Sequence, residues 1–125
     1  MTITLNHTIV PARDKEAAAR SFAQLFGLNF EGSSGRFAPV RVNETLTLDF
    51  ADQVGAFEIH HYAFHVSDAE FDAILQRVQA AGLPFGSTPW SLNDAKLNDW
   101  NGGRGFYFKD LDGHILELMT QGDRI

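Results

Sequence analysis

The sequence contains no cysteine, and this absence removes several chemistries at once. Disulfide bonds, thiolate metal ligands and a cysteine nucleophile are all excluded. The sequence also lacks an apolar run of membrane-spanning length, and residues 1–5 begin a strand-like alternation without the basic start of a signal peptide. We therefore expect a cytoplasmic protein with no membrane partner.

Positive charge is scarce as well. The chain has 10 Lys and Arg residues against 16 Asp and Glu residues, which gives a formal net charge of -6. This balance argues against a nucleic-acid partner, because binding to phosphates needs a basic face. The 125 residues, of which 44% are hydrophobic, fit one globular domain with an ordinary core.

What the sequence does contain is a weak internal repeat, the first pattern to look for in any chain. Residues 7–30 recur, in the same order, at residues 61–85. Further on, residues 48–50 match residues 116–118. Each half therefore begins with a histidine and ends near a carboxylate.

Each half predicts the element order βαβββ. Helix caps are expected at Asp14 and Ser67, and glycines end both predicted helices. In the first half we expect a strand at 3–10, a helix to residue 26, and strands near 28–32, 36–42 and 45–50. In the second half we expect a strand at 59–66, a helix to residue 81, and strands near 84–87, 105–109 and 114–120.

The repeat also predicts the domain organisation. Residues 51–57 are expected to link a first module, 1–50, to a second module, 58–125, within a single domain. Because side chains alternate along a strand, Asp49 and Glu117 should point away from the apolar residues beside them. We expect the apolar face of each module to lie under its helix, and the opposite face to form a concave, partly polar surface.

The repeated histidines and the carboxylate suggest a metal site. His7, His61 and Glu117 together form a set of two histidines and one carboxylate, which often holds a divalent ion with open coordination positions. A single histidine on a strand is more often a surface or core residue. Two histidines at the same place in duplicated units favour a shared function.

Three segments carry a resemblance to a known family. Residues 6–10, 61–68 and 105–118 resemble the vicinal oxygen chelate superfamily, which includes glyoxalase I, fosfomycin-resistance thiol transferases, extradiol dioxygenases and bleomycin-resistance proteins. The last segment is close to the family ending F-x-D-P-D-G-x-x-x-E, with Leu111 where proline is usual. The resemblance implies an α+β fold of two βαβββ modules, whose mixed sheet curls around a concave cavity.

The resemblance also implies a ligand set and an activity. It makes His7, His61 and Glu117 the protein ligands of a divalent ion, and such mixed ligation fits Zn, Ni, Mn, Fe or Co. We predict a glyoxalase-like lyase or isomerase in which the ion binds two adjacent substrate oxygens and Glu117 or Asp49 moves a proton. Asp49 lies where glyoxalase I-like members have a fourth ligand, but it is shorter than glutamate. For Asp49 the roles of ligand, general base and solvated aspartate all stay open.

Other functions of the same superfamily remain as alternatives. A small-molecule binding protein of the bleomycin-resistance type is the first, although such binders lack the His/His/Glu set. The second alternative, and the third option after the glyoxalase-like enzyme and the binding protein, is a fosfomycin-type thiol transferase or an extradiol dioxygenase. Thiol transfer to a phosphonate needs several cations, and this chain has few. In every case the partners expected are a small molecule and a second copy of the chain, because small family members form homodimers.

Four more residues are candidates for a substrate pocket. His65 shares a strand face with His61, and Arg104 is a cation that can meet an anionic ligand. Trp90 and Trp100 lie in the long segment 88–104, which has no clear periodicity. Both tryptophans are large enough either to close an apolar pocket over a ligand or simply to anchor the loop.

Overall fold

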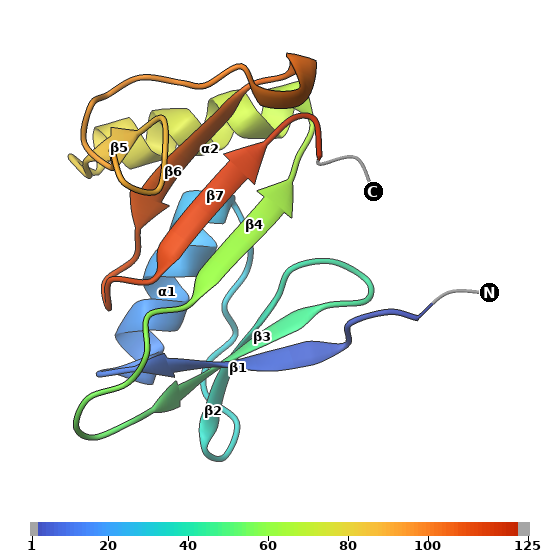
Figure 1. Ribbon diagram of the computed structural model, residues 1–125. Coiled ribbons are helices and arrows are strands. Elements are labelled where there is room, and N and C mark those ends of the chain that lie inside the picture. Colours follow the sequence, from blue (N-terminus) through green and yellow to red (C-terminus); the bar gives the residue numbers. More distant parts are fainter. Residues whose placement is uncertain (1–2, 123–125) are drawn as a thin grey trace. The chain divides into compact units, whose positions relative to one another are not determined.

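The computed structural model describes residues 3–122, which divide into two compact units on either side of the Glu58–Ile59 bond. We call residues 3–58 module one and residues 59–122 module two. Each module has a small mixed sheet and one α-helix (Figure 1). The predicted α+β class, with a duplicated arrangement of strands and helix, is confirmed.

Module one contains a three-stranded sheet in the order β1-β3-β2. Strand β1 runs parallel to β3, and β2 runs antiparallel to β3. The elements of this module are β1 (His7–Ala12), α1 (Lys15–Phe26), β2 (Phe37–Arg41) and β3 (Thr47–Asp52).

Module two contains a four-stranded sheet in the order β4-β7-β6-β5. The edge strand β4 runs parallel to β7, and the other two pairs are antiparallel. The elements are β4 (His61–His65), α2 (Asp68–Ala80), β5 (Phe85–Gly86), the short 3-10 helix η1 (Trp100–Gly102), β6 (Gly105–Lys109) and β7 (Ile115–Met119).

Both helices begin at the predicted caps. The Asp14 side chain accepts hydrogen bonds from the first turn of α1, which ends at Gly27 in a left-handed conformation with φ of 71°. Ser67 and Glu70 form a capping box at the start of α2. In the part of the chain that the structure describes, no helix has both the length and the apolar character needed to cross a membrane.

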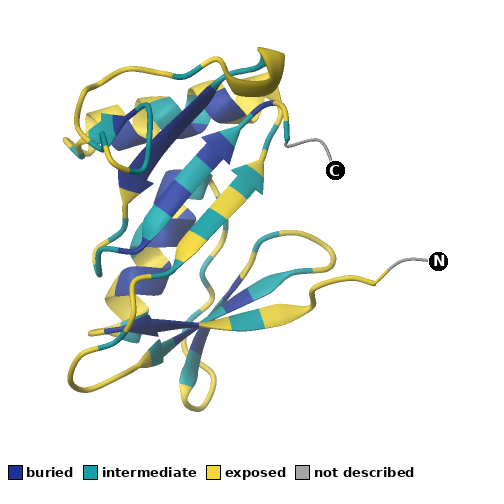
Figure 2. Ribbon diagram, in the orientation of Figure 1, coloured by how far each residue is buried: buried dark blue, intermediate teal, exposed yellow. Residues whose placement is uncertain are grey.

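Each helix covers the apolar face of its own sheet. Phe22 of α1 contacts Phe50 of β3, with ring centroids 5.8 Å apart, and Phe71 of α2 contacts Phe106 of β6 at 5.2 Å. Burial alternates along the strands, as Figure 2 shows for β3 and β7. We call the other side of each sheet, which faces away from its helix, the open face.

The register of the strands places the repeated residues at equivalent positions. Strand β1 pairs Ile9 with Asp49, and β4 pairs Ala63 with Glu117. In each module the histidine that begins the strand lies two residues earlier and therefore points to the same face. Asp49 thus occupies in module one the position that Glu117 occupies in module two, on the open face as predicted.

One predicted strand is wrong. Residues 28–32 form no strand, so module one has three strands where four were expected. The sheet ends at β2, and Pro39 at the centre of β2 has no N–H group to donate to a further strand. Gly32, with φ of 99°, also breaks the extended conformation. At the other end of the module, β3 continues to Asp52, into the segment predicted as a link.

Candidate functional site

His61 and Glu117 form the centre of the candidate site on the open face of module two. His61 begins β4, and Glu117 lies at the middle of the parallel neighbour β7. Nε2 of His61 lies 3.0 Å from Oε1 of Glu117. The His61 side chain is 46% exposed and the Glu117 side chain 13%, so solvent reaches the pair from one side.

The geometry of this pair fits two ligands of one metal ion. Two ligand atoms that are each about 2.1 Å from an ion, and about 90° apart around it, lie about 3.0 Å from each other. An imidazole nitrogen and a carboxylate oxygen are ordinary ligands for divalent transition metals. Among residues 3–122, no group of three His, Cys, Asp or Glu side chains could hold a metal ion, so of the three predicted ligands the structure brings together His61 and Glu117.

His7, the third predicted ligand, lies at the start of β1 in module one, where it is exposed. Its Nδ1 donates to Oδ1 of Asn6 over 2.8 Å, which leaves Nε2 as the nitrogen with a free lone pair. Metal-binding histidines usually donate their second N–H to an oxygen in this way. The orientation of the His7 ring therefore suits a ligand.

Asp49 lies on the open face of module one, in the middle of β3. Within the described residues its carboxylate takes part in no hydrogen bond or ion pair. In this respect Asp49 differs from Glu117, which contacts His61. The carboxylate is chemically available as a ligand or as a base.

An aromatic wall adjoins the His61–Glu117 pair. Tyr107 of β6 pairs with Glu117 across the strands, and its ring lies 5.8 Å from the ring of His61. Trp100 of η1 packs edge-on against Tyr107, at 5.9 Å between centroids. Trp100 was a predicted pocket residue, whereas Tyr107 was missed. Its signal was present in the sequence, because Tyr107 sits between the apolar residues Phe106 and Phe108 and must point to the other face.

Two more predicted pocket residues, His65 and Arg104, have hydrogen-bond partners within module two. His65 is on the open face with His61, and its Nε2 donates to the carbonyl of Thr120 over 3.0 Å. The Arg104 guanidinium donates to Asp72 at 2.8 Å and to Asp68 at 2.9 Å, both on α2. These hydrogen bonds raise the pKa of Arg104 further. Arg104 thus attaches the start of β6 to the helix.

A buried polar cluster lies behind β4, away from the open face. His114 is completely buried, and its Nδ1 accepts the backbone N–H of His60 over 2.9 Å. The His60 ring is in turn 2.6 Å from the hydroxyl of Tyr62. Burial, with a contribution from the charge of Asp110, raises the pKa of Tyr62 to about 12. His60 and His114 therefore have hydrogen-bond partners inside module two and lie away from the open face.

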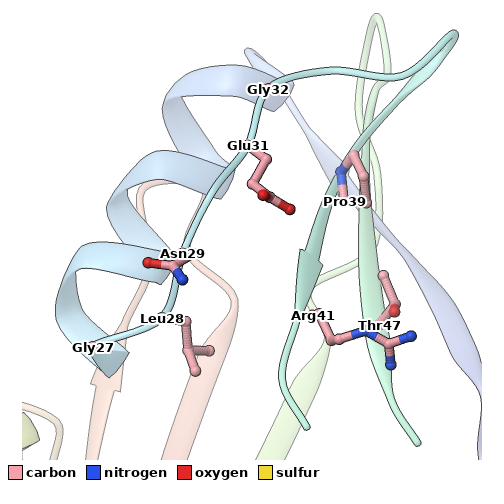
Figure 3. A pocket seen from close by; sticks show the side chains of 8 residues that line it. All are labelled: Gly27, Leu28, Asn29, Glu31, Gly32, Pro39, Arg41 and Thr47. Atoms are coloured by element: carbon pink, nitrogen blue, oxygen red, sulfur yellow. The ribbon is translucent and has the colours of Figure 1, made fainter. Parts of the chain in front are cut away.

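Module one has a pocket of its own where the predicted strand is missing. Its volume is about 470 Å³, and it lies between residues 27–32 and strands β2 and β3 (Figure 3). Glu31 lines it from the loop, and Arg41 lines it from β2. Nη1 of Arg41 also donates to the carbonyls of Asn43 and Glu44, at 3.2 and 3.1 Å. Polar and apolar side chains both line this pocket.

Comparison with known proteins was made by sequence and by structure. No protein-family model matches the chain. Among curated proteins, glutathione transferase FosA of Serratia marcescens is 27% identical over 124 residues, which cover 94% of this chain and 81% of the relative. The chain therefore aligns with this relative along nearly its whole length.

Two solved structures are considerably more similar. Oxidase ChaP-H2 is 43% identical, with a TM-score of 0.92, covering 98% of this chain and 96% of that one. Oxidase ChaP-H1 is 40% identical, with a TM-score of 0.91, covering 97% and 98%. The same fold recurs, at 20% identity and a TM-score of 0.72, in a glyoxylase/bleomycin resistance protein/dioxygenase domain from Frankia sp. EAN1pec, over 95% of this chain and 92% of that one.

Proposed function

Because the chain belongs to the vicinal oxygen chelate superfamily, we propose that it is a metal-dependent oxidase of a small organic substrate. The observation that carries this proposal is the contact of 3.0 Å between Nε2 of His61 and Oε1 of Glu117 on the open face. His7 is proposed as the third ligand. The proposal departs from the predicted lyase or isomerase activity and lies nearer to the third option, which included a dioxygenase.

Two facts support an oxidase. The solved structures at 43% and 40% identity are both oxidases and align over nearly the whole chain. A set of two histidines and one carboxylate with open positions is also typical of non-haem iron oxygenases. Iron is therefore our first choice among the five metals that the sequence allows. The predicted lyase or isomerase activity has weaker support, because the lactoylglutathione lyase of Agrobacterium tumefaciens is only 21% identical.

The protein residues around the proposed ion have separable roles. When bound, a divalent ion supplies Lewis acidity to adjacent substrate oxygens and, if it is redox-active, electrons for chemistry with dioxygen. Asn6 fixes the tautomer of His7 by accepting its Nδ1–H. Tyr107 lies beside the His61 ring and, being buried, limits its movement. Asp49 is proposed as the group that accepts a substrate proton, since its carboxylate has no protein partner among the described residues.

A fosfomycin-type thiol transferase is the second candidate. It is favoured by the curated relative, FosA, which aligns with 94% of this chain. A phosphonate substrate requires cations, and Arg104, which was predicted to meet an anionic ligand, is paired with Asp68 and Asp72. For this reason we place it after the oxidase. The alternative of a protein that only sequesters its ligand does not account for the His61–Glu117 pair.

The test combines metal analysis with two assays. The protein would be reconstituted anaerobically with Fe(II), Mn(II) or Zn(II) and its metal content measured. Oxygen uptake would then be followed with catechols and α-hydroxy ketones, which present two adjacent oxygens, and glutathione transfer would be followed with fosfomycin. Oxygen uptake with Fe(II) that disappears in Glu117→Gln supports the oxidase. Glutathione transfer without oxygen uptake would replace the proposal with the second candidate.

A further inference from the structure

A second pocket lies in module two, and its lining suggests the chemical character of the substrate. Its volume is about 470 Å³, within the range of small-molecule sites. Apolar side chains form most of the wall, and a single lysine reaches it from β6. The residues that matter here are Leu83, Pro84, Pro89, Trp90, Leu92 and Lys109.

This pocket adjoins the open face that carries the metal ligands. Ile115 pairs with His61 on one side and with Lys109 on the other. Cross-strand partners point to the same face, so His61 and Lys109 belong to one row across β4, β7 and β6. Glu117 lies in the next row of the same face. The pocket therefore lies on the same side of the sheet as the His61–Glu117 pair, and strand β7 separates Lys109 from His61.

Trp90 is the most unusual residue of the pocket. It is 80% exposed, although a tryptophan side chain is normally among the largest contributors to a core or an interface. Its loop is held in place by hydrogen bonds: the Asp94 carboxylate accepts from the backbone and hydroxyl of Ser87, and Asn98 donates to the Ser87 carbonyl. An exposed aromatic ring on a fixed loop is preorganised to stack on a ligand.

Lys109 supplies a positive charge at the edge of the apolar wall. Its ammonium group makes no hydrogen bond or ion pair within the described residues. Asp110 also lines the pocket, but Oδ1 of its carboxylate accepts the backbone N–H groups of Asp112 and His114, each at 2.9 Å. The lysine is thus the group available to an anionic oxygen.

The corresponding pocket of module one shows that the apolar wall is not imposed by the fold. By the repeat and the register, Leu28 corresponds to Leu83 and Arg41 to Lys109, so both pockets keep a leucine and a cation. In module one the other walls carry Glu31 and neighbouring polar side chains (Figure 3). Both pockets have proline in their walls, but the module-two wall also contains the aromatic side chain of Trp90. Of the two pockets, the one in module two is better suited to an apolar ligand.

We propose that the pocket of module two binds the flat, apolar part of an anionic aromatic substrate, with its ring against Trp90 and its acidic oxygen toward Lys109. This assignment rests on the proposed function only in naming the bound molecule as the substrate. The binding itself requires no metal and no turnover. It can therefore be tested separately.

The experiment uses 2-naphthoate as the probe and its neutral analogue 2-naphthamide as the control ligand. Calorimetry would give the affinities, and the indole N–H signal of Trp90 would be followed by NMR, with Trp100→Phe identifying which of the two indole signals it is. We expect Trp90→Ala to weaken both ligands at least tenfold. Lys109→Met should weaken naphthoate about fivefold to tenfold and leave naphthamide unchanged. Lys96→Met, in the same loop but outside the pocket, should change neither.

The outcomes separate this inference from the proposed function. Naphthoate that binds Glu117→Gln with normal affinity, while oxygen uptake is lost, supports both. If naphthoate binds but no metal gives oxygen uptake, the proposed binding pocket is supported and the proposed oxidase activity is wrong. The inference is wrong if folded wild-type protein does not bind naphthoate at millimolar concentration, or if Trp90→Ala binds it normally.

Discussion

The two modules have the same backbone plan but different contacts on their open faces. In module two, His61 and Glu117 lie 3.0 Å apart. In module one the equivalent histidine, His7, donates instead to Asn6, and the equivalent carboxylate, Asp49, makes no hydrogen bond or ion pair within the described residues. Aspartate is one methylene shorter than glutamate. The duplicated register brings the two groups to the same face, and side-chain length and local partners decide whether they meet.

The modules also differ at the turn that precedes the carboxylate strand. The same backbone hydrogen bond closes both turns, from Val42 to Leu46 at 2.8 Å and from Asp110 to His114 at 3.0 Å. In module one an aliphatic side chain follows the turn, whereas in module two a fully buried histidine does. Module two therefore uses polar side-chain contacts to hold the start of β7, the strand that carries Glu117.

The largest expected effect concerns the two carboxylates. Glu117→Gln should abolish metal retention and turnover, because the neutral amide is a much poorer ligand for a divalent ion. Asp49→Asn should retain the metal and lower the maximal rate at least tenfold, as expected for loss of a general base. Metal content and steady-state kinetics of both variants measure this. Loss of metal from Asp49→Asn would make Asp49 a fourth ligand and erase the difference between the modules.

A second prediction asks which chains supply the ligands. We expect a homodimer, which light scattering at micromolar concentration would detect. If His7 joins the His61 and Glu117 of the partner, mixing His7→Ala with Glu117→Gln gives hybrid dimers that contain one intact site. Random exchange should then restore about a quarter of the wild-type activity. No restoration, despite subunit exchange shown by mass spectrometry, would place all three ligands within one chain.

The cores should respond alike in both modules. Leu48 and Leu116 occupy equivalent buried positions and are each 2% exposed. Replacement of either leucine by alanine should lower the free energy of unfolding by about 2–5 kcal/mol, since each leaves a cavity under a helix. Leu111→Ala, at an exposed position, is the control and should change little. Chemical denaturation measures all three, and a near-neutral Leu48→Ala would mean that module one is more loosely packed.

The smallest expected effect is the titration of Tyr62, in the buried polar cluster of module two. Of the two tyrosines, Tyr62 should titrate with a pKa of about 12, raised first by burial and then by the charge of Asp110. Because the folded pKa lies above the ordinary value of 10.0, this group favours folding below pH 10 and the benefit is lost as the pH rises toward 12. Tyrosinate absorbance would show the step, and Tyr62→Phe should remove it. If the step that Tyr62→Phe removes lies near pH 10 instead, the buried environment is contradicted.

Much of each module follows from local sequence. The caps at Asp14 and Ser67 and the stop at Gly27 depend on residues within one helical turn, so they were predictable. The same holds for the faces of β3 and β7, because side-chain alternation is a property of a single strand. The repeat then indicated that Asp49 and Glu117 hold equivalent positions before any pairing was known.

Other features were decided by contacts between distant segments. Residues 28–32 alternate like a strand, but the neighbouring edge carries Pro39 and offers no donor at that point. Arg104 looked available to a ligand, yet α2 places two aspartates within 2.9 Å of it. No local pattern encodes these partners, since each lies more than one element away.

The sequence by itself determined the duplication, the element types and the residues that share a face, because these depend on short-range geometry and on alternation. Only the tertiary structure decided that Glu117 reaches His61, that Tyr107 lies against the same ring, and that Trp90 stands exposed beside Lys109. Those relations depend on which strands become neighbours, on the rotamers that the packing permits, and on how the loop at 88–104 is fixed. They are set by the whole fold at once, and no single segment carries them.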